Sequence, residues 1–96
     1  MNTTIASAIR ERHALEFFYK GHRRVVEPHT YGLDRKAQNE KLSAWQITGK
    51  PADEPDWRYY EVAEIGELRE LPQSFGKARD GYKRNDPRMS TIYAQV

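Results

Sequence analysis

The residues of this chain best suited to binding or catalysis lie in one segment, residues 23–32, which reads RRVVEPHTYG. Arg24 alternates with Val26 and Pro28, so in an extended strand it points inward if those two residues do. A buried guanidinium requires an anionic partner, and its rigid fork of donors suits phosphate. Arg24 is therefore a predicted ligand-binding residue. Arg23, on the opposite side of the strand, is predicted to be an ordinary solvated charge.

The same segment carries the one arrangement that suggests acid–base chemistry. Glu27, His29 and Tyr31 alternate and would share one face of the strand. One histidine and one carboxylate fall short of a metal site or a complete acid–base set, and a lone histidine is usually structural. We predict no catalytic residue, no metal site and no cofactor, and we keep His29 only as a ligand-binding candidate.

A second arginine, Arg58, lies in a later aromatic strand. It alternates with Tyr60 and Val62 and should face the core or a pocket rather than open water. An ion pair with a glutamate of the chain would explain this placement as well as a ligand contact would. Both interpretations stay open, and Arg58 is a predicted ligand-binding residue.

Aromatic residues that could stack on bases are spread over two predicted strands. Trp45 alternates with Ser43 and Ile47, on the face opposite Leu42 and Ala44. An exposed Trp45 would favour binding of bases by stacking, whereas aromatic residues in a small barrel more often fill the core or a partner interface. Trp45 is included among the ligand-binding candidates.

The C-terminal segment interleaves basic and aromatic residues. Their order is Phe75, Lys77, Arg79, Tyr82, Lys83, Arg84 and Arg88. This spacing suits a phosphate backbone with stacked bases, and we predict that Lys83 and Arg84 bind ligand. The alternative is a polar extension that packs across the barrel through its apolar side chains.

Hydrophobic periodicity predicts the elements that position these residues. Ile5, Ala8 and Ile9 predict a helix over 4–13, with Thr3 or Thr4 as its cap. Strands are predicted at 15–20, 24–30, 41–48, 57–62 and 67–71, loops at 33–40 and 49–56, a helical turn at 63–66, and a further edge strand at 90–96.

These elements predict an α+β fold that is mostly β. An N-terminal helix should be followed by a small, strongly bent antiparallel sheet or an SH3-like or Sm-like barrel. The barrel should occupy residues 1–75, and residues 76–96 should form an extension packed on it. Pro28 cannot donate to a ladder, so its strand should lie at an edge or bend there.

Composition limits the class of protein. The 96 residues fit one domain, and 38% hydrophobic with 31% charged residues indicates a globular chain. The absence of cysteine excludes disulfides and thiolate metal sites and favours a cytoplasmic protein, and no segment resembles a secretory signal or a membrane span. Basic residues predominate at both ends and acidic residues in 51–72, which could present a positive face to phosphate.

The order of these segments resembles a WYL domain. The helix with Ala8-Ile9-Arg10, the strand 15–19 and the run 24–29 resemble the opening of that family, and 42–45 and 57–65 resemble its third and fourth strands. The resemblance implies an Sm-like barrel of bacterial transcription regulators and phage-defence proteins, which is thought to sense nucleic acids or nucleotides through a basic pocket. Arg58 matches one family arginine.

The chain departs from the family at three points. The tripeptide that names the family would fall at 40–42, where its Trp and Tyr are missing and only Leu42 remains. Glu64 stands where a second family arginine is usual, and the chain has no helix-turn-helix. The resemblance therefore implies a stand-alone relative.

We predict a non-enzymatic regulatory or ligand-binding module that senses nucleic acid or nucleotide through a basic pocket. The predicted partners are single-stranded nucleic acid or nucleotide, together with a second copy or a separate output protein, and no membrane. One alternative is a small basic ribonuclease-like toxin that uses Arg24, Glu27, His29 and Tyr31. Another is a protein–protein assembly module that pairs through the edge strand at 90–96.

Overall fold

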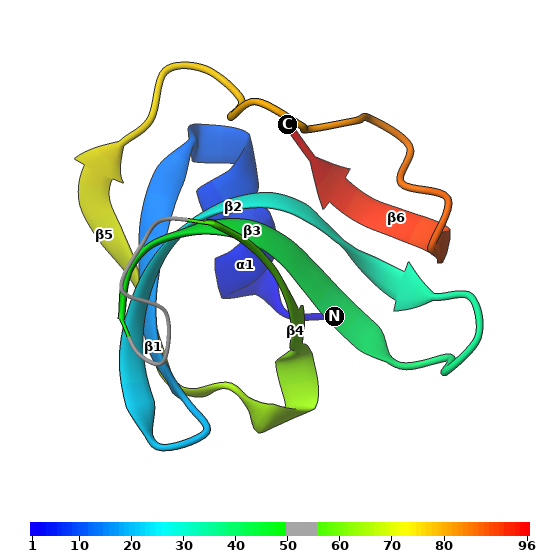
Figure 1. Cartoon of the computed structure of the whole chain (residues 1–96), viewed down its shortest axis with the longest axis horizontal. Helices are drawn as coiled ribbons and strands as arrows, with labels where there is room; N and C mark the ends of the chain where they lie inside the picture. Colours follow the sequence, from blue (N-terminus) through cyan, green and yellow to red (C-terminus); the bar gives the residue numbers. More distant parts are fainter. Residues whose placement is uncertain (50–55) are drawn as a thin grey trace.

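A computed structural model describes residues 1–49 and 56–96, and it confirms the predicted fold class: an α+β fold, mostly β, with one N-terminal helix and a strongly bent antiparallel β-sheet (Figure 1). The elements are α1 (Thr3–Glu11), β1 (His13–Tyr19), β2 (His22–Asp34), β3 (Glu40–Gly49), β4 (Asp56–Glu61), the 3-10 turn η1 (Val62–Glu64), β5 (Gly66–Ser74) and β6 (Met89–Gln95). Most of the loop predicted at 49–56 lies outside the described residues.

Strand β2 organises the sheet. The strand order is β4-β3-β2-β1-β5, and β6 also pairs with β2. Along one side of β2, β1 is paired up to Val26 and β6 is paired from Thr30. Pro28 lies between these stretches, where the strand has one neighbour instead of two and a missing N–H is tolerated. The strand is therefore central rather than at an edge, and of the two predicted alternatives the structure favours the second, because the pairing of β2 with β3 is irregular just after Pro28.

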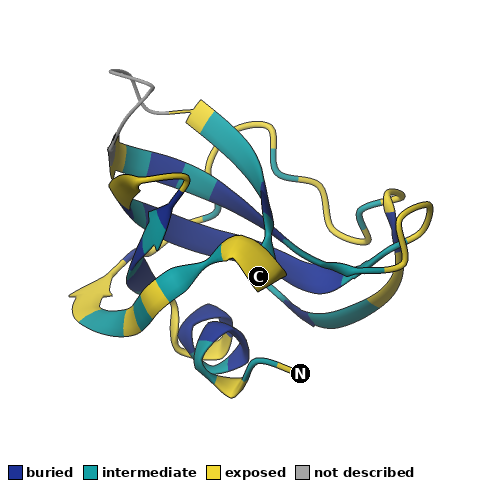
Figure 2. Ribbon diagram, turned by 90° about the horizontal axis from the view of Figure 1, so that it is seen from below, coloured by how far each residue is buried: buried dark blue, intermediate teal, exposed yellow. Residues whose placement is uncertain are grey.

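The core lies between the helix and the face of the sheet that curves around it, which we call the inner face. The helix buries Ile5, Ala8 and Ile9 there, and Figure 2 shows buried residues on the central strands and on the side of the helix that faces them. Phe17 and Tyr60 of the inner face meet edge to face, with ring centroids 5.0 Å apart. This packing holds the sheet in its bent shape.

The helix begins one residue earlier than predicted and is capped differently. The side chain of Asn2, rather than Thr3 or Thr4, accepts a hydrogen bond of 3.0 Å from the backbone N–H of Ile5. The helix ends at Glu11 because Arg12 adopts a left-handed conformation with φ of 57°. This short helix then leads directly into β1.

The strand expected at 90–96 pairs with β2 inside the same chain, as β6. Gly32 makes this pairing possible, because a Cβ atom there would lie 2.2 Å from the backbone oxygen of Thr91. Glycine is thus required for close approach of two backbones rather than to end the strand. The long loop before β6 is held against the sheet as a consequence.

Candidate ligand-binding cleft

The opposite face of the sheet, which we call the outer face, carries polar and aromatic residues. Glu27, Trp45 and Trp57 lie side by side on β2, β3 and β4, and Ser43 lies beside Tyr59. The irregular segment 75–88, drawn from yellow to orange in Figure 1, connects β5 to β6 and contacts this face. We call this segment the strap.

A β-bulge at His29 decides which side chains reach the outer face. Pro28 pairs with Ala44 and Thr30 with Ser43, so His29 is the extra residue. Beyond the bulge, Tyr31 pairs with Leu42 in the core. Strict alternation, which placed Tyr31 beside His29, fails at this point.

The four residues of the ribonuclease alternative therefore do not come together. Tyr31 is buried in the core and donates to the carboxylate of Glu40 at 2.5 Å. Arg24 is also on the inner face, whereas His29 and Glu27 are engaged by the strap on the outer face.

His29 joins the strap to the sheet. Its ring is fully buried, Nδ1 lies 2.8 Å from the carbonyl oxygen of Glu27, and Nε2 accepts the backbone N–H of Arg79 at 3.2 Å. This pattern requires a neutral ring that carries its proton on Nδ1. Burial lowers the pKa of His29. Both ring nitrogens are engaged in hydrogen bonds within the protein. His29 therefore positions the surrounding residues and does not itself offer a nitrogen to a ligand.

Arg79 and Trp57 hold the strap at two further points. The guanidinium of Arg79 donates to both carboxylate oxygens of Glu27, at 2.7 and 3.0 Å, and lies over the ring of Trp45. The indole N–H of Trp57 donates to the carbonyl oxygen of Asp80 at 2.9 Å. Gly81, with φ of +91°, lets the chain turn beside that indole. These contacts fix the strap where it crosses β3 and β4.

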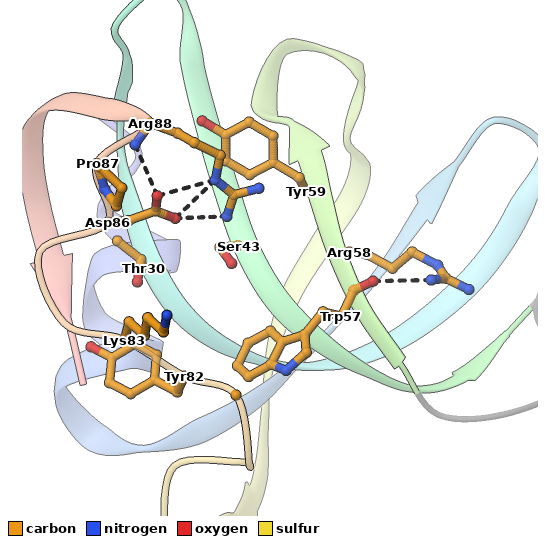
Figure 3. A pocket seen from close by; sticks show the side chains of 11 residues that line it. Thr30, Ser43, Trp57, Arg58, Tyr59, Tyr82, Lys83, Asp86, Pro87 and Arg88 are labelled. Carbon is orange, nitrogen blue, oxygen red and sulfur yellow. Dashed lines mark hydrogen bonds and ion pairs between the residues drawn. The ribbon is translucent and has the colours of Figure 1, made fainter.

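A cleft of about 290 Å³ lies between the outer face and residues 81–88 of the strap (Figure 3). Its walls include Trp57 and Tyr82, whose rings are inclined by only 24° with centroids 6.5 Å apart. The ring of His29 contacts both of them, with centroid distances of 4.7 and 5.2 Å. The hydroxyl residues Thr30 and Ser43 line the sheet side. We call this site the Trp57–Tyr82 cleft.

Two of the basic residues at the cleft face it differently. Lys83 is exposed, and in Figure 3 its ammonium points toward the middle of the cleft. Arg88 lies 3.9 Å from the ring centroid of Tyr59 and is paired with Asp86 at 2.6 Å. The hydrogen bonds from Arg88 hold the pKa of Asp86 below its usual range. Lys83 is thus the cation best placed to meet a phosphate.

Arg58 lines the same cleft, but its guanidinium points away from the other residues (Figure 3). It donates to the carbonyl oxygen of Trp57 at 2.9 Å and to Asp56 at 3.2 Å. An exposed aspartate on its own strand is therefore its partner, rather than one of the glutamates considered from the sequence. The phosphate-binding role predicted for Arg58 has no support from this orientation.

Arg24 lies on the inner face, the face of the sheet opposite to the cleft, and only 4% of it is exposed. Its guanidinium donates to the carbonyl oxygen of Tyr19 at 3.0 Å and to Gln46 at 3.3 Å, beside the rings of Tyr19 and Tyr60. Within the described residues, Arg24 has no carboxylate partner, and its Nε atom has no hydrogen-bond partner. Burial raises the pKa of Tyr60 to about 12, and the charge of Arg24 opposes this shift.

The remaining predicted residues lie around the cleft rather than in it. Arg84 donates to the carbonyl oxygen of Val96 at 3.1 Å, which also accepts from the hydroxyl of Tyr82. Trp45 lines a second cleft together with Arg79. Thr30, Ser43 and Arg88 were not among the predicted site residues, because only the bulge and the path of the strap place them at the same cleft as Trp57.

Comparisons with known proteins add no family: no family model matches the chain, and no curated protein or solved structure is significantly similar to it. In residues 1–49 and 56–96, no helix has the length and apolar character needed to cross a membrane. The same residues contain no group of three or more histidine, aspartate or glutamate side chains placed to hold a metal ion.

Proposed function

We propose that this chain is a non-enzymatic ligand-binding module whose Trp57–Tyr82 cleft holds one nucleotide unit, either free or within single-stranded nucleic acid. The observation that carries the proposal is the combination of two nearly parallel aromatic rings with an unengaged lysine, Lys83, in one open cleft. Among residues 1–49 and 56–96, Lys83 has no ion-pair partner.

The rings would provide most of the affinity for a base. Trp57 and Tyr82 are nearly parallel and line the same cleft, so a base can stack on either ring. Stacking on aromatic side chains contributes about 1–3 kcal/mol per base and tolerates any base sequence. The site therefore suits recognition of nucleotides with little sequence preference.

Polar groups would orient the sugar and phosphate. Lys83 is placed to bind a phosphate oxygen as a point charge, and Arg88, held on Tyr59 by Asp86, adds a second cation at the far end of the cleft. Thr30 and Ser43 offer hydroxyl groups that can donate to or accept from a base edge or a ribose. No group in this set is arranged for bond cleavage, which favours binding over catalysis.

The regulatory role rests on the resemblance to WYL domains, and we infer that the chain is a WYL-like sensor. The order of a short helix followed by a bent antiparallel sheet supports this inference. The cleft proposed here lies on the outer face and uses the strap, so it differs from a pocket built on Arg24 and Arg58. A sensor of this kind needs an output, which a second copy or a separate protein would supply.

Titration of a labelled single-stranded oligonucleotide of about ten nucleotides, followed by fluorescence anisotropy over a salt series, tests the proposal. We expect binding at low salt that weakens as salt rises, with quenching of tryptophan fluorescence. Lys83→Ala should weaken binding about fivefold and reduce the slope of log affinity against log salt by about 0.7.

Lys20→Ala is the matched control, because Lys20 is an exposed lysine in the turn between β1 and β2, away from the strap. It should bind like the unmodified protein. Absence of binding by the unmodified protein at low salt, to both the oligonucleotide and a mononucleotide, would overturn the proposal.

A further inference from the structure

A second cleft, of about 520 Å³, lies farther along the strap, nearer to β5 than the Trp57–Tyr82 cleft. It is lined by Glu27 and Trp45 of the outer face and by the strap residues Phe75, Lys77 and Arg79. Neither the fold nor the first site requires this opening. Its charged and aromatic groups suggest that it binds a ligand of the same chemistry.

Arg79 is the organising residue of the second cleft. Its guanidinium is fixed in one plane by two hydrogen bonds to Glu27 and lies 5.5 Å from the ring centroid of Trp45. Nevertheless 45% of the Arg79 side chain is exposed, whereas Glu27 is buried. A guanidinium held flat with one side open is a stacking platform for a base. Because Glu27 holds it before any ligand arrives, little side-chain entropy would be lost on binding.

The two clefts are adjacent on the sheet. Trp45 in the second cleft meets Trp57 in the first cleft edge to face, with centroids 5.6 Å apart. Asp80 lines the second cleft and the next residue, Gly81, lines the first, so this part of the strap forms a ridge between the two clefts. Lys77 is exposed on the far side and can meet a phosphate there.

We propose that the Arg79–Trp45 cleft is a second base subsite, so that the ligand of this protein is a single-stranded polynucleotide rather than a free mononucleotide. One base stacks in the Trp57–Tyr82 cleft and a neighbouring base stacks on the guanidinium of Arg79. Lys83 and Lys77 bind phosphates on the two sides of the ridge. This inference rests on the proposed function, because it extends the ligand of the first cleft.

The test compares a mononucleotide with an oligothymidylate of about ten nucleotides at low salt, in the full chain and in two variants of the second cleft. Arg79→Lys keeps the charge that pairs with Glu27 but removes the planar platform. Lys77→Ala removes only an exposed charge. Lys20→Ala is the control, and circular dichroism checks that each variant is folded.

We expect the oligonucleotide to bind at least tenfold more tightly than the mononucleotide, since a second stacked base adds about 1–3 kcal/mol. Lys77→Ala should weaken oligonucleotide binding about threefold with mononucleotide affinity unchanged, and Arg79→Lys should weaken oligonucleotide binding about tenfold. The inference is overturned if the two ligands bind equally well, or if Lys77→Ala leaves oligonucleotide binding intact. If the unmodified protein binds neither the mononucleotide nor the oligonucleotide, the proposed function is overturned, and the second subsite with it.

Discussion

The two faces of the sheet are covered in different ways. The inner face packs on a regular helix through apolar side chains such as Ile5, Ile9 and Phe17, and it is almost completely buried. The outer face is covered by the strap, which has no regular structure and is attached through Glu27 and His29. A helix covers a sheet continuously, whereas a few polar attachments leave openings between them. Both clefts lie on the outer face for this reason.

We therefore expect the inner face to contribute mainly to the stability of the fold and the outer face to contribute mainly to the proposed ligand binding. The inner face excludes water and provides most of the hydrophobic stabilisation of the small domain. The outer face keeps aromatic rings half-buried beside exposed cations, which is the combination that a nucleotide needs. Changes on the inner face should therefore alter the free energy of unfolding, and changes on the outer face should mainly alter ligand affinity.

The largest effect is expected from truncation of the inner core. Phe17→Ala removes a fully buried ring that packs on Tyr19 and Tyr60, so it should lower the free energy of unfolding by about 3–5 kcal/mol. Trp45→Ala, on the outer face, removes a larger but half-buried side chain and should cost less than half as much. Urea unfolding of both variants measures the difference. Equal losses would contradict the division between the faces.

A smaller loss is expected when the attachment of the strap is broken. Glu27→Gln removes the charge that holds Arg79, and it should cost about 1–3 kcal/mol, between the values for exposed and for fully buried pairs, because Glu27 is buried and Arg79 is half-exposed. Glu16→Gln is the matched control. Glu16 pairs with the exposed residues Arg23 and Arg69, so its loss should cost less than about 1 kcal/mol. If the control is the more destabilising of the two, Glu27 does not hold the strap.

A pH dependence should follow from His29. Its pKa in the folded protein is lowered by burial, so the unfolded chain binds a proton more readily. Stability should be constant above the ordinary histidine pKa of about 6.5 and should fall as the pH decreases from there toward the lowered pKa. Urea unfolding between neutral and acidic pH measures this decrease. It should persist in His22→Gln, which changes an exposed histidine, and disappear from His29→Gln; the opposite pattern would rule out His29 as its source.

The smallest effect is expected from the one arginine buried in the inner face. Arg24→Met replaces a guanidinium that has no carboxylate partner within the described residues with an apolar side chain of similar length. Because burial of such a charge is costly, the variant should be as stable as the unmodified protein or more stable by about 1 kcal/mol. Oligonucleotide affinity should also be unchanged. A marked loss of affinity would indicate that the ligand binds at the inner face. The proposed division of stability and binding between the two faces would then be wrong.

Several parts of the fold could be predicted from local patterns. Alternation between 41 and 48 correctly separated Leu42 and Ala44 from Ser43 and Trp45, and helical spacing found α1 to within two residues at either end. The end of strand β2 was predicted less well from the alternation of residues. This strand continues to Asp34, into residues that were predicted to form a loop, because β3 and β6 pair with it on both sides.

The candidate cleft was anticipated only in part. Lys83, chosen from its position among basic and aromatic residues, lines this cleft, and its role in ligand binding stays a prediction. Arg58 was chosen because it alternates with the buried residue Tyr60, but its long side chain reaches out of the core to Asp56. Alternation specifies the side of the strand from which a side chain leaves. It does not specify where the end of a flexible side chain goes.

The sequence by itself determined a helix that buries one apolar stripe and a set of short strands that must bend around it, since these depend on residues close together in the chain. Only the tertiary structure decided where the clefts lie. The bulge at His29 depends on pairing between β2 and β3, and the path of the strap depends on contacts of Arg79 and Trp57 with residues far away in sequence. Such contacts leave no periodic signal, because each is a single interaction between distant segments.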